Sequence, residues 1–117
     1  MIHQGDVFWL DLDDPVGSGP GFRRPVVVVQ NDLFNESRLG TTMVCSLTSN
    51  PRHAAAPGNV IVPATEGGLS ADSVALVTQV FTVDKRMLVE QTGSLPTRRV
   101  RQIIDGLRFA VEPTGPA

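Results

Sequence analysis

The chain has 117 residues, a formal net charge of −2 at pH 7 and one cysteine. We expect one domain at residues 1–111 and a frayed tail at residues 112–117, because this length can bury a core without disulfides or metal ions. The charge argues against a general polyanion-binding surface, although nine of the ten cations are arginine, the better bidentate partner for phosphate. With no apolar run long enough to span a membrane, no secretion signal and a lone Cys45, we expect a soluble cytoplasmic protein.

Short apolar and β-branched segments alternate along the chain with glycine, proline and other turn formers. They predict strands at residues 5–12, 25–29, 41–47, 59–63, 72–82 and 89–95. Trp9 in the first strand is assigned to the core. Brief helical turns are predicted after the second strand, where Asn31 or Asp32 can cap the first of them, and at residues 83–88.

The clearest helix is predicted at residues 97–111, where apolar residues recur at helical spacing after Thr97, the expected N-cap. Its four arginines are assigned to a solvated face, and its internal Gly106 indicates close packing. Many short strands with one terminal helix predict a mainly β protein, a small closed barrel with short helices and a C-terminal α-helix.

A glycine-rich loop leads into the second strand. Glycines 17, 19 and 21 allow backbone N–H groups to approach an anion such as phosphate. Pro25 holds Arg24 extended at the start of the strand, and Arg23 points to the opposite side. From these residues alone, an ordinary surface loop whose arginines face solvent remains an alternative interpretation.

Asp11, Asp13 and Asp14 run into a turn, and no metal site is predicted.

Four local patterns follow one another: Gly5-Asp-Val-Phe-Trp9; Arg23-Arg-Pro-Val-Val-Val-Val-Gln30; Leu47-Thr-Ser49; and Asp72-Ser-Val74 followed by Gln79-Val80 and Thr82-Val-Asp-Lys85. In this order and spacing they resemble the MazF/PemK family of toxins of type II toxin-antitoxin systems, over residues 2–111. The resemblance implies an SH3-like small β-barrel of the MazF/CcdB kind. It also implies a cytoplasmic homodimer that causes growth arrest and cleaves single-stranded RNA, including mRNA, at short sequences without a metal or cofactor. The implied partner is a small acidic antitoxin, and the complex of the two binds DNA.

The resemblance assigns roles to individual residues. The family's essential arginine before the proline falls on Arg24, and its hydroxyl residue after the third strand falls on Thr48; these are the predicted catalytic residues. The predicted RNA-binding residues are Gly17, Ser18, Gly21, Arg23, Ser49 and Gln79. Some members carry an acidic residue in the loop before the arginine, and residues 19–22 offer none here.

The implied chemistry suits these residue types. In cleavage by the RNA 2′-hydroxyl the substrate supplies the nucleophile, and the products carry a 2′,3′-cyclic phosphate and a 5′-hydroxyl. Arg24 and Thr48 can then orient the attack and stabilise charge on the phosphate oxygens. Because the pKa of arginine is above 12, we assign Arg24 as electrostatic stabiliser and candidate proton donor to the leaving oxygen. No general base is assigned, although His53, just past Thr48, is a candidate RNA contact.

Two other readings stay open. Small barrels host many functions, so the chain can be a non-catalytic binding module for nucleic acid or protein. It can also resemble the CcdB toxins, which share the barrel and inhibit DNA gyrase through a Trp-Gly-Ile end, but this chain ends Pro113-Thr-Gly-Pro-Ala117.

Overall fold

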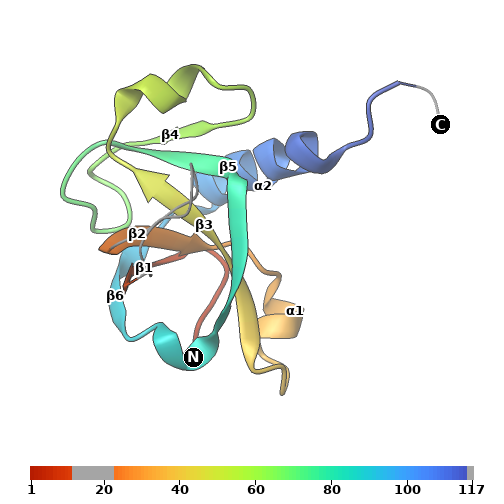
Figure 1. Ribbon diagram of the computed structural model, residues 1–117. Helices are drawn as coiled ribbons and strands as arrows, with labels where there is room; N and C mark the ends of the chain where they lie inside the picture. The colour runs from red at the N-terminus through yellow and green to blue at the C-terminus, as the bar shows by residue number, and fades with distance from the viewer. Residues whose placement is uncertain (12–22, 116–117) are drawn as a thin grey trace.

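The computed structural model describes residues 1–11 and 23–115 of the chain. In that part six antiparallel strands form one sheet in the order β4-β5-β3-β2-β1-β6 (Figure 1). The strands are β1 (Asp6–Asp11), β2 (Arg23–Val28), β3 (Thr41–Thr48), β4 (Val60–Val62), β5 (Ser73–Asp84) and β6 (Glu90–Ser94). The helical segments are α1 (Asp32–Asn35), the 3₁₀ turns η1 (Pro51–Ala55) and η2 (Lys85–Met87), and α2 (Thr97–Val111).

The central strands are buried on both faces, as the run of valines in β2 predicts. Val27 belongs to a core cluster that includes Cys45 and Leu47 and packs against α2 through Ile103. Val26 and Val28 point the other way, into a second cluster with Phe8 and Leu10. Strands β1, β2, β3 and β5 therefore each contribute residues to two apolar layers, one on either face of the sheet.

The predicted fold class is confirmed: the chain is mainly β, a small barrel-like sheet with short helices and a C-terminal α-helix. The predicted closure is not seen, because in the described residues the edge strands β4 and β6 do not pair with each other. The turn at residues 63–69 packs on β6 instead. Its Gly67 oxygen accepts a 2.7 Å hydrogen bond from Thr92 Oγ1, and a Cβ added at Gly68 would lie 2.1 Å from the Thr92 carbonyl oxygen. Glycine at this position permits the close approach.

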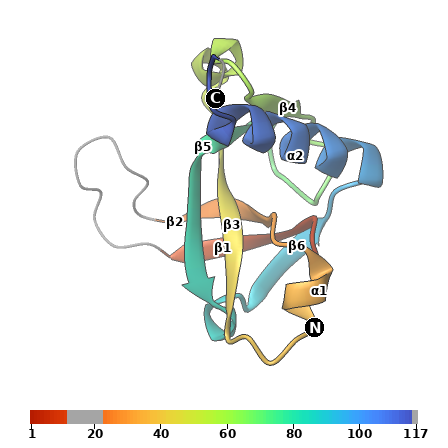
Figure 2. The same cartoon turned by 90° about the vertical axis from the view of Figure 1, so that its right-hand side faces the viewer.

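Helix α2 lies across the sheet beside β4 and β5 (Figure 2). The expected packing of Gly106 is confirmed, since a Cβ there would lie 2.1 Å from the carbonyl oxygen of Gly58. Thr97, however, is already the first helical residue. The N-cap is Pro96, which has no side-chain donor or acceptor, so the prediction of Thr97 as cap is wrong.

The arginines of α2 are not all solvated. Arg99, whose side chain is 17% exposed, bonds both carboxylate oxygens of Glu66 at 2.7 and 3.0 Å. Arg98 also reaches Glu66, at 3.2 Å. The prediction of a solvated face is wrong for Arg99, because the 63–69 turn lies against the first turn of the helix, whereas the Arg98 side chain is 71% exposed.

Most predicted elements occur within a few residues of their expected bounds. Asn31 caps α1 by accepting a hydrogen bond from the Leu33 N–H at 2.8 Å.

Two local predictions are wrong. β2 begins at Arg23 rather than at Pro25, because both arginines pair with β1. Trp9 is half-buried rather than in the core, because its face of β1 is covered only in part at this end of the sheet.

Candidate active site

Arg24 and Thr48 lie at the same end of two neighbouring strands. The register of β2 with β3 runs from Val28↔Val44 to Val26↔Ser46. Continuing this register by two residues places Thr48 opposite Arg24. Opposite residues share a face, and their Cβ atoms are then about 5 Å apart. The pairing itself ends at Val26↔Ser46, so the observed arrangement places Arg24 and Thr48 at the same end of two neighbouring strands.

The face that carries this pair is the one that holds the second core cluster. Arg24 is the Cα partner of Leu10, and Leu10 and Val26 both belong to that cluster. The two polar residues thus extend a row of buried apolar side chains, and both are half-buried. A guanidinium and a hydroxyl at the rim of an apolar layer can bind a phosphate where water screens them less than on an open surface.

Arg23 lies on the opposite face, as alternation predicts. Its guanidinium pairs with Glu90 and with Asp11, the latter at 3.3 Å, and its Cζ lies 5.2 Å from the centre of the Trp9 ring. The hydrogen bond to Glu90, then that to Asp11, raises the pKa of Arg23. The sequence offered a weak signal for this set: alternation places Trp9 and Asp11 on one face of β1, but nothing local indicated Glu90.

Ser49 and Gln79 lie on opposite faces of the sheet. Ser49 follows Thr48 and is exposed; it lines a pocket of about 120 Å³ with Trp9, Pro25 and Ser73. Gln79 lies in β5 next to Val80, the partner of Cys45 in β3, and on the face of Phe81, which packs against the second core cluster. Gln79 is therefore on the face of Arg24 and Thr48, and Ser49 is not. The predicted contacts Gly17, Ser18 and Gly21 lie outside the described residues.

The described residues hold few groups for acid-base or nucleophilic work. His53 is exposed in η1, just past β3. Cys45 is fully buried with its Sγ 3.1 Å from the Leu76 carbonyl oxygen, and burial raises its pKa to about 12. Its assignment as a small buried hydrophobe is confirmed, and a thiolate nucleophile is excluded at neutral pH. Within residues 1–11 and 23–115, three or more His, Cys, Asp or Glu residues nowhere cluster in a way that could hold a metal ion.

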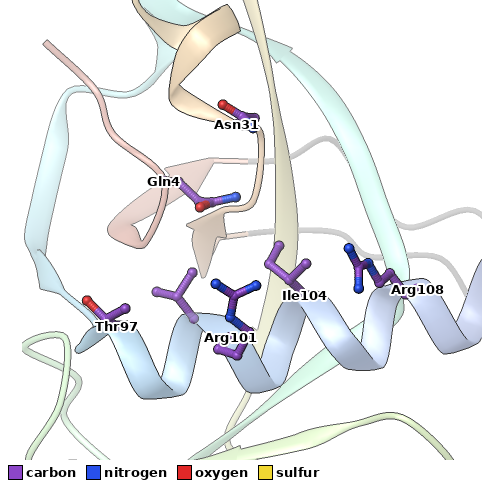
Figure 3. Close-up of a pocket in the computed structure, with 7 residues that line it drawn as sticks. Gln4, Asn31, Thr97, Arg101, Ile104 and Arg108 are labelled. Carbon is purple, nitrogen blue, oxygen red and sulfur yellow. The ribbon is translucent and has the colours of Figure 1, made fainter.

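A larger pocket lies at the other end of the strands (Figure 3). It measures about 310 Å³ and contains Gln4, Asn31 and the α2 arginines Arg101 and Arg108. Gln4 precedes β1, whereas Arg24 pairs near the end of that strand. Of the predicted catalytic and RNA-binding residues that the structure describes, none lines this pocket, so the volume of a pocket does not by itself identify the candidate site.

A family model described as the PemK-like, MazF-like toxin of type II toxin-antitoxin systems matches residues 3–111. The chain belongs to this family. It is 43% identical over 112 residues to the endoribonuclease MazF6 of Mycobacterium tuberculosis, a match that covers 96% of this chain and 98% of the relative. It is 32% identical over 111 residues to the endoribonuclease EndoA of Bacillus subtilis, covering 95% of each chain.

The fold is shared with solved structures of MazF-like proteins. One, an endoribonuclease in complex with its cognate antitoxin from a mycobacterial species, superposes with a TM-score of 0.77 at 19% identity and covers 99% of this chain and 100% of its own. This likeness establishes the MazF-like fold. Separately, no helix in the described ranges is long and apolar enough to cross a membrane.

Proposed function

We propose that this chain is the toxin of a type II toxin-antitoxin pair and a sequence-specific endoribonuclease that cleaves single-stranded RNA. The observation that carries the proposal is that Arg24 and Thr48 lie at the same end of two neighbouring strands, in a chain that belongs to the MazF-like family. The names of its relatives, endoribonuclease MazF6 and endoribonuclease EndoA, support the same activity.

The proposed reaction needs no nucleophile from the protein. The RNA 2′-oxygen attacks the adjacent phosphorus, the bond from phosphorus to the 5′-oxygen breaks, and a 2′,3′-cyclic phosphate and a 5′-hydroxyl form. The 2′-hydroxyl loses one proton and the leaving oxygen gains one. Arg24 binds the non-bridging phosphate oxygens, where charge grows in the transition state, and is the proposed donor to the leaving oxygen. The Thr48 hydroxyl orients the same phosphate.

The remaining predicted contacts are proposed to hold RNA rather than to act on it. Gln79 lies on the catalytic face and is proposed to contact the nucleotides beside the cut. Ser49 and Arg23 lie on the opposite face, and we propose that they bind RNA that passes over the end of the sheet. Arg23 is already paired with two carboxylates, so its contribution to phosphate binding should be smaller than that of a free guanidinium. Gly17, Ser18 and Gly21 complete the proposed site.

We further propose that the protein acts in the cytoplasm as a homodimer and is inhibited by a small acidic antitoxin, with which it binds DNA. The description of the mycobacterial structure as a complex with a cognate antitoxin supports such a partner. Because the site must accept an extended polyanion, an extended acidic segment that folds on binding would fit it.

The test is digestion of a long RNA by purified protein in EDTA, with mapping of the new ends. We expect cuts within a short sequence motif and ends of the cyclic-phosphate and 5′-hydroxyl type. Cleavage that requires added metal would contradict the mechanism. Binding without cleavage would favour the non-catalytic binding module, and inhibition of gyrase would favour the CcdB-like alternative.

A substrate with one 2′-deoxyribose immediately 5′ of the cut phosphate isolates the chemical step. It lacks the internal nucleophile, so cleavage should stop there while binding persists. A matched oligonucleotide with the deoxyribose one position 3′ of the cut should still be cleaved. If the first substrate is cut at the modified position, water or a protein group is the nucleophile and the proposed mechanism is wrong.

A further inference from the structure

Two buried polar atoms near the catalytic pair have no hydrogen-bond partner in the described part of the structure. They are the hydroxyl oxygen of Ser46 and the side-chain oxygen of Gln79. Ser46 is 0% exposed, and Gln79 is half-buried with its oxygen covered. Buried polar atoms in proteins nearly always have a hydrogen-bond partner. Two such atoms without a partner on the same face of the sheet therefore need an explanation.

The strand register would set these two residues opposite each other if it continued by one step. β3 and β5 keep one register from Thr41↔Asp84 to Cys45↔Val80, and its next step is Ser46 opposite Gln79. Regular pairing ends there and resumes at Leu47↔Ala75, so residues 76–79 of β5 lie opposite Ser46 alone. The pairing is interrupted here by a bulge or a similar irregularity of β5; bulges re-aim side chains and are frequent beside active sites.

The same face also carries the catalytic pair one row further on. Ser46 pairs with Val26 in β2, and Arg24 and Thr48 come two residues later on their strands. Ser46 is fully enclosed, so RNA does not reach it without rearrangement. Gln79 lies closer to the surface. The hydroxyl is thus placed to act on RNA through Gln79 rather than directly.

We propose that Ser46 is a positioning residue whose hydroxyl shares one ordered water with the Gln79 side-chain oxygen, and that this water fixes the Gln79 amide beside Arg24 and Thr48. One water molecule can donate a hydrogen bond to Gln79 Oε1 and also bond the Ser46 hydroxyl, so that both atoms gain a partner. The free amide N–H₂ of Gln79 then points in a defined direction for RNA. The kinetic part of this inference rests on the proposed ribonuclease function.

The first test is independent of activity. A crystal structure of the whole protein at a resolution that shows ordered water should contain a water within about 2.6–3.2 Å of both Ser46 Oγ and Gln79 Oε1. A direct bond between the two side chains, or separate partners for each of them, would overturn the proposal.

The second test compares Ser46→Ala with Thr42→Val, a matched control on the same strand and face. Thr42 is also 0% exposed, but its hydroxyl donates to Asn35 Oδ1 at 2.7 Å. Ser46→Ala removes no bond to the protein, so the melting temperature should stay level or rise while kcat/KM for RNA falls roughly fivefold to tenfold. Thr42→Val should lower the melting temperature and leave kcat/KM unchanged. A merely structural role for Ser46 would give the Thr42 pattern and overturn the proposal.

The third test is a double-mutant cycle with Gln79→Ala. If Ser46 acts through Gln79, Ser46→Ala should cause no further loss in the Gln79→Ala background. Additive losses would overturn the proposal. If wild type cleaves RNA and Ser46→Ala cleaves it equally well, this inference fails while the proposed function stands. If wild type cleaves no RNA, the proposed function fails. The positioning role of Ser46 is then tested only by whether the crystal structure contains the shared water.

Discussion

Arg23 and Arg24 are adjacent in the sequence but occupy different environments. Arg24 shares a face with Leu10 and, by register, Thr48. Arg23 is held between two carboxylates over the Trp9 ring. The difference follows from strand alternation, which sends neighbouring side chains to opposite faces. Two arginines that are equivalent in the sequence therefore have different surroundings in the fold.

Arg24→Ala and Thr48→Ala should each lower the RNA cleavage rate by about 10²- to 10³-fold, the usual effect of one positioned group on a developing charge. Both residues are half-buried at strand ends, so thermal stability should change little. Single-turnover cleavage and thermal melting measure the two effects. Arg101→Ala, which removes the same charge from α2, is the control and should keep near-wild-type turnover. Near-wild-type cleavage by either site variant would refute the role of that residue.

At the scale of elements, two contacts fix α2 against the rest of the fold. Gly106 meets the carbonyl oxygen of Gly58, and Arg99 meets Glu66. The first depends on the absence of a side chain and the second on a partly buried ion pair. Each can be removed by one substitution that does not touch the candidate active site.

Gly106→Ala should destabilise the protein by about 1–3 kcal/mol, although alanine is the better helix former, because the added Cβ would lie 2.1 Å from a backbone oxygen. The free energy of unfolding in urea measures the effect. Gly40→Ala is the control, since a Cβ there meets nothing within 4 Å. It should be neutral or stabilise slightly through the unfolded chain. Equal effects of the two substitutions would mean that α2 does not pack as closely as the structure shows.

Glu66→Gln should lower the free energy of unfolding by about 1 kcal/mol at pH 7, because it weakens the bonds from Arg99 to a carboxylate that is 9% exposed. The hydrogen bond from Arg99 lowers the pKa of Glu66 in the folded protein. The stabilisation is thus complete above the unfolded pKa of about 4.3 and is lost as pH falls through the lower folded value. Urea unfolding at a series of pH values should show a constant difference between wild type and variant from about pH 7 to 5 that shrinks below about pH 4. A difference that grows on acidification would contradict this assignment.

At the scale of the whole molecule, the formal net charge of −2 does not attract polyanions. Any attraction for RNA must therefore come from local groups of basic residues. Four of the described arginines lie in three separate places: Arg24 on the candidate catalytic face, Arg23 on the opposite face of β2, and Arg101 and Arg108 in the pocket beside α2. A partner that mimics RNA must therefore reach the end of β2 rather than coat the surface.

The proposed antitoxin should bind less tightly as salt is raised, because charge pairing contributes to its affinity. Titration of purified toxin with the product of the neighbouring gene, at about 0.1 M and 0.5 M salt, measures this. Arg24→Ala should weaken binding more than Arg101→Ala does, and Arg23→Ala should have a smaller effect than Arg24→Ala, because Arg23 lies on the opposite face of β2. Equal affinity of the neighbour for wild type and for both Arg23→Ala and Arg24→Ala would refute the idea that it occupies the RNA site.

The sequence by itself determined the strands, the terminal helix, the buried Cys45 and the family, because these depend on local periodicity, turn residues and short motifs within each segment. It also placed Arg24 and Thr48 at strand ends. Only the tertiary structure decided which strands are neighbours and in what register. The fold places Arg24 and Thr48 at the same end of neighbouring strands and Ser46 one residue beyond the pair Cys45↔Val80, and it brings Arg23 to Glu90, 67 residues away. Contacts between such distant segments depend on how the curled sheet packs, and no local pattern encodes them.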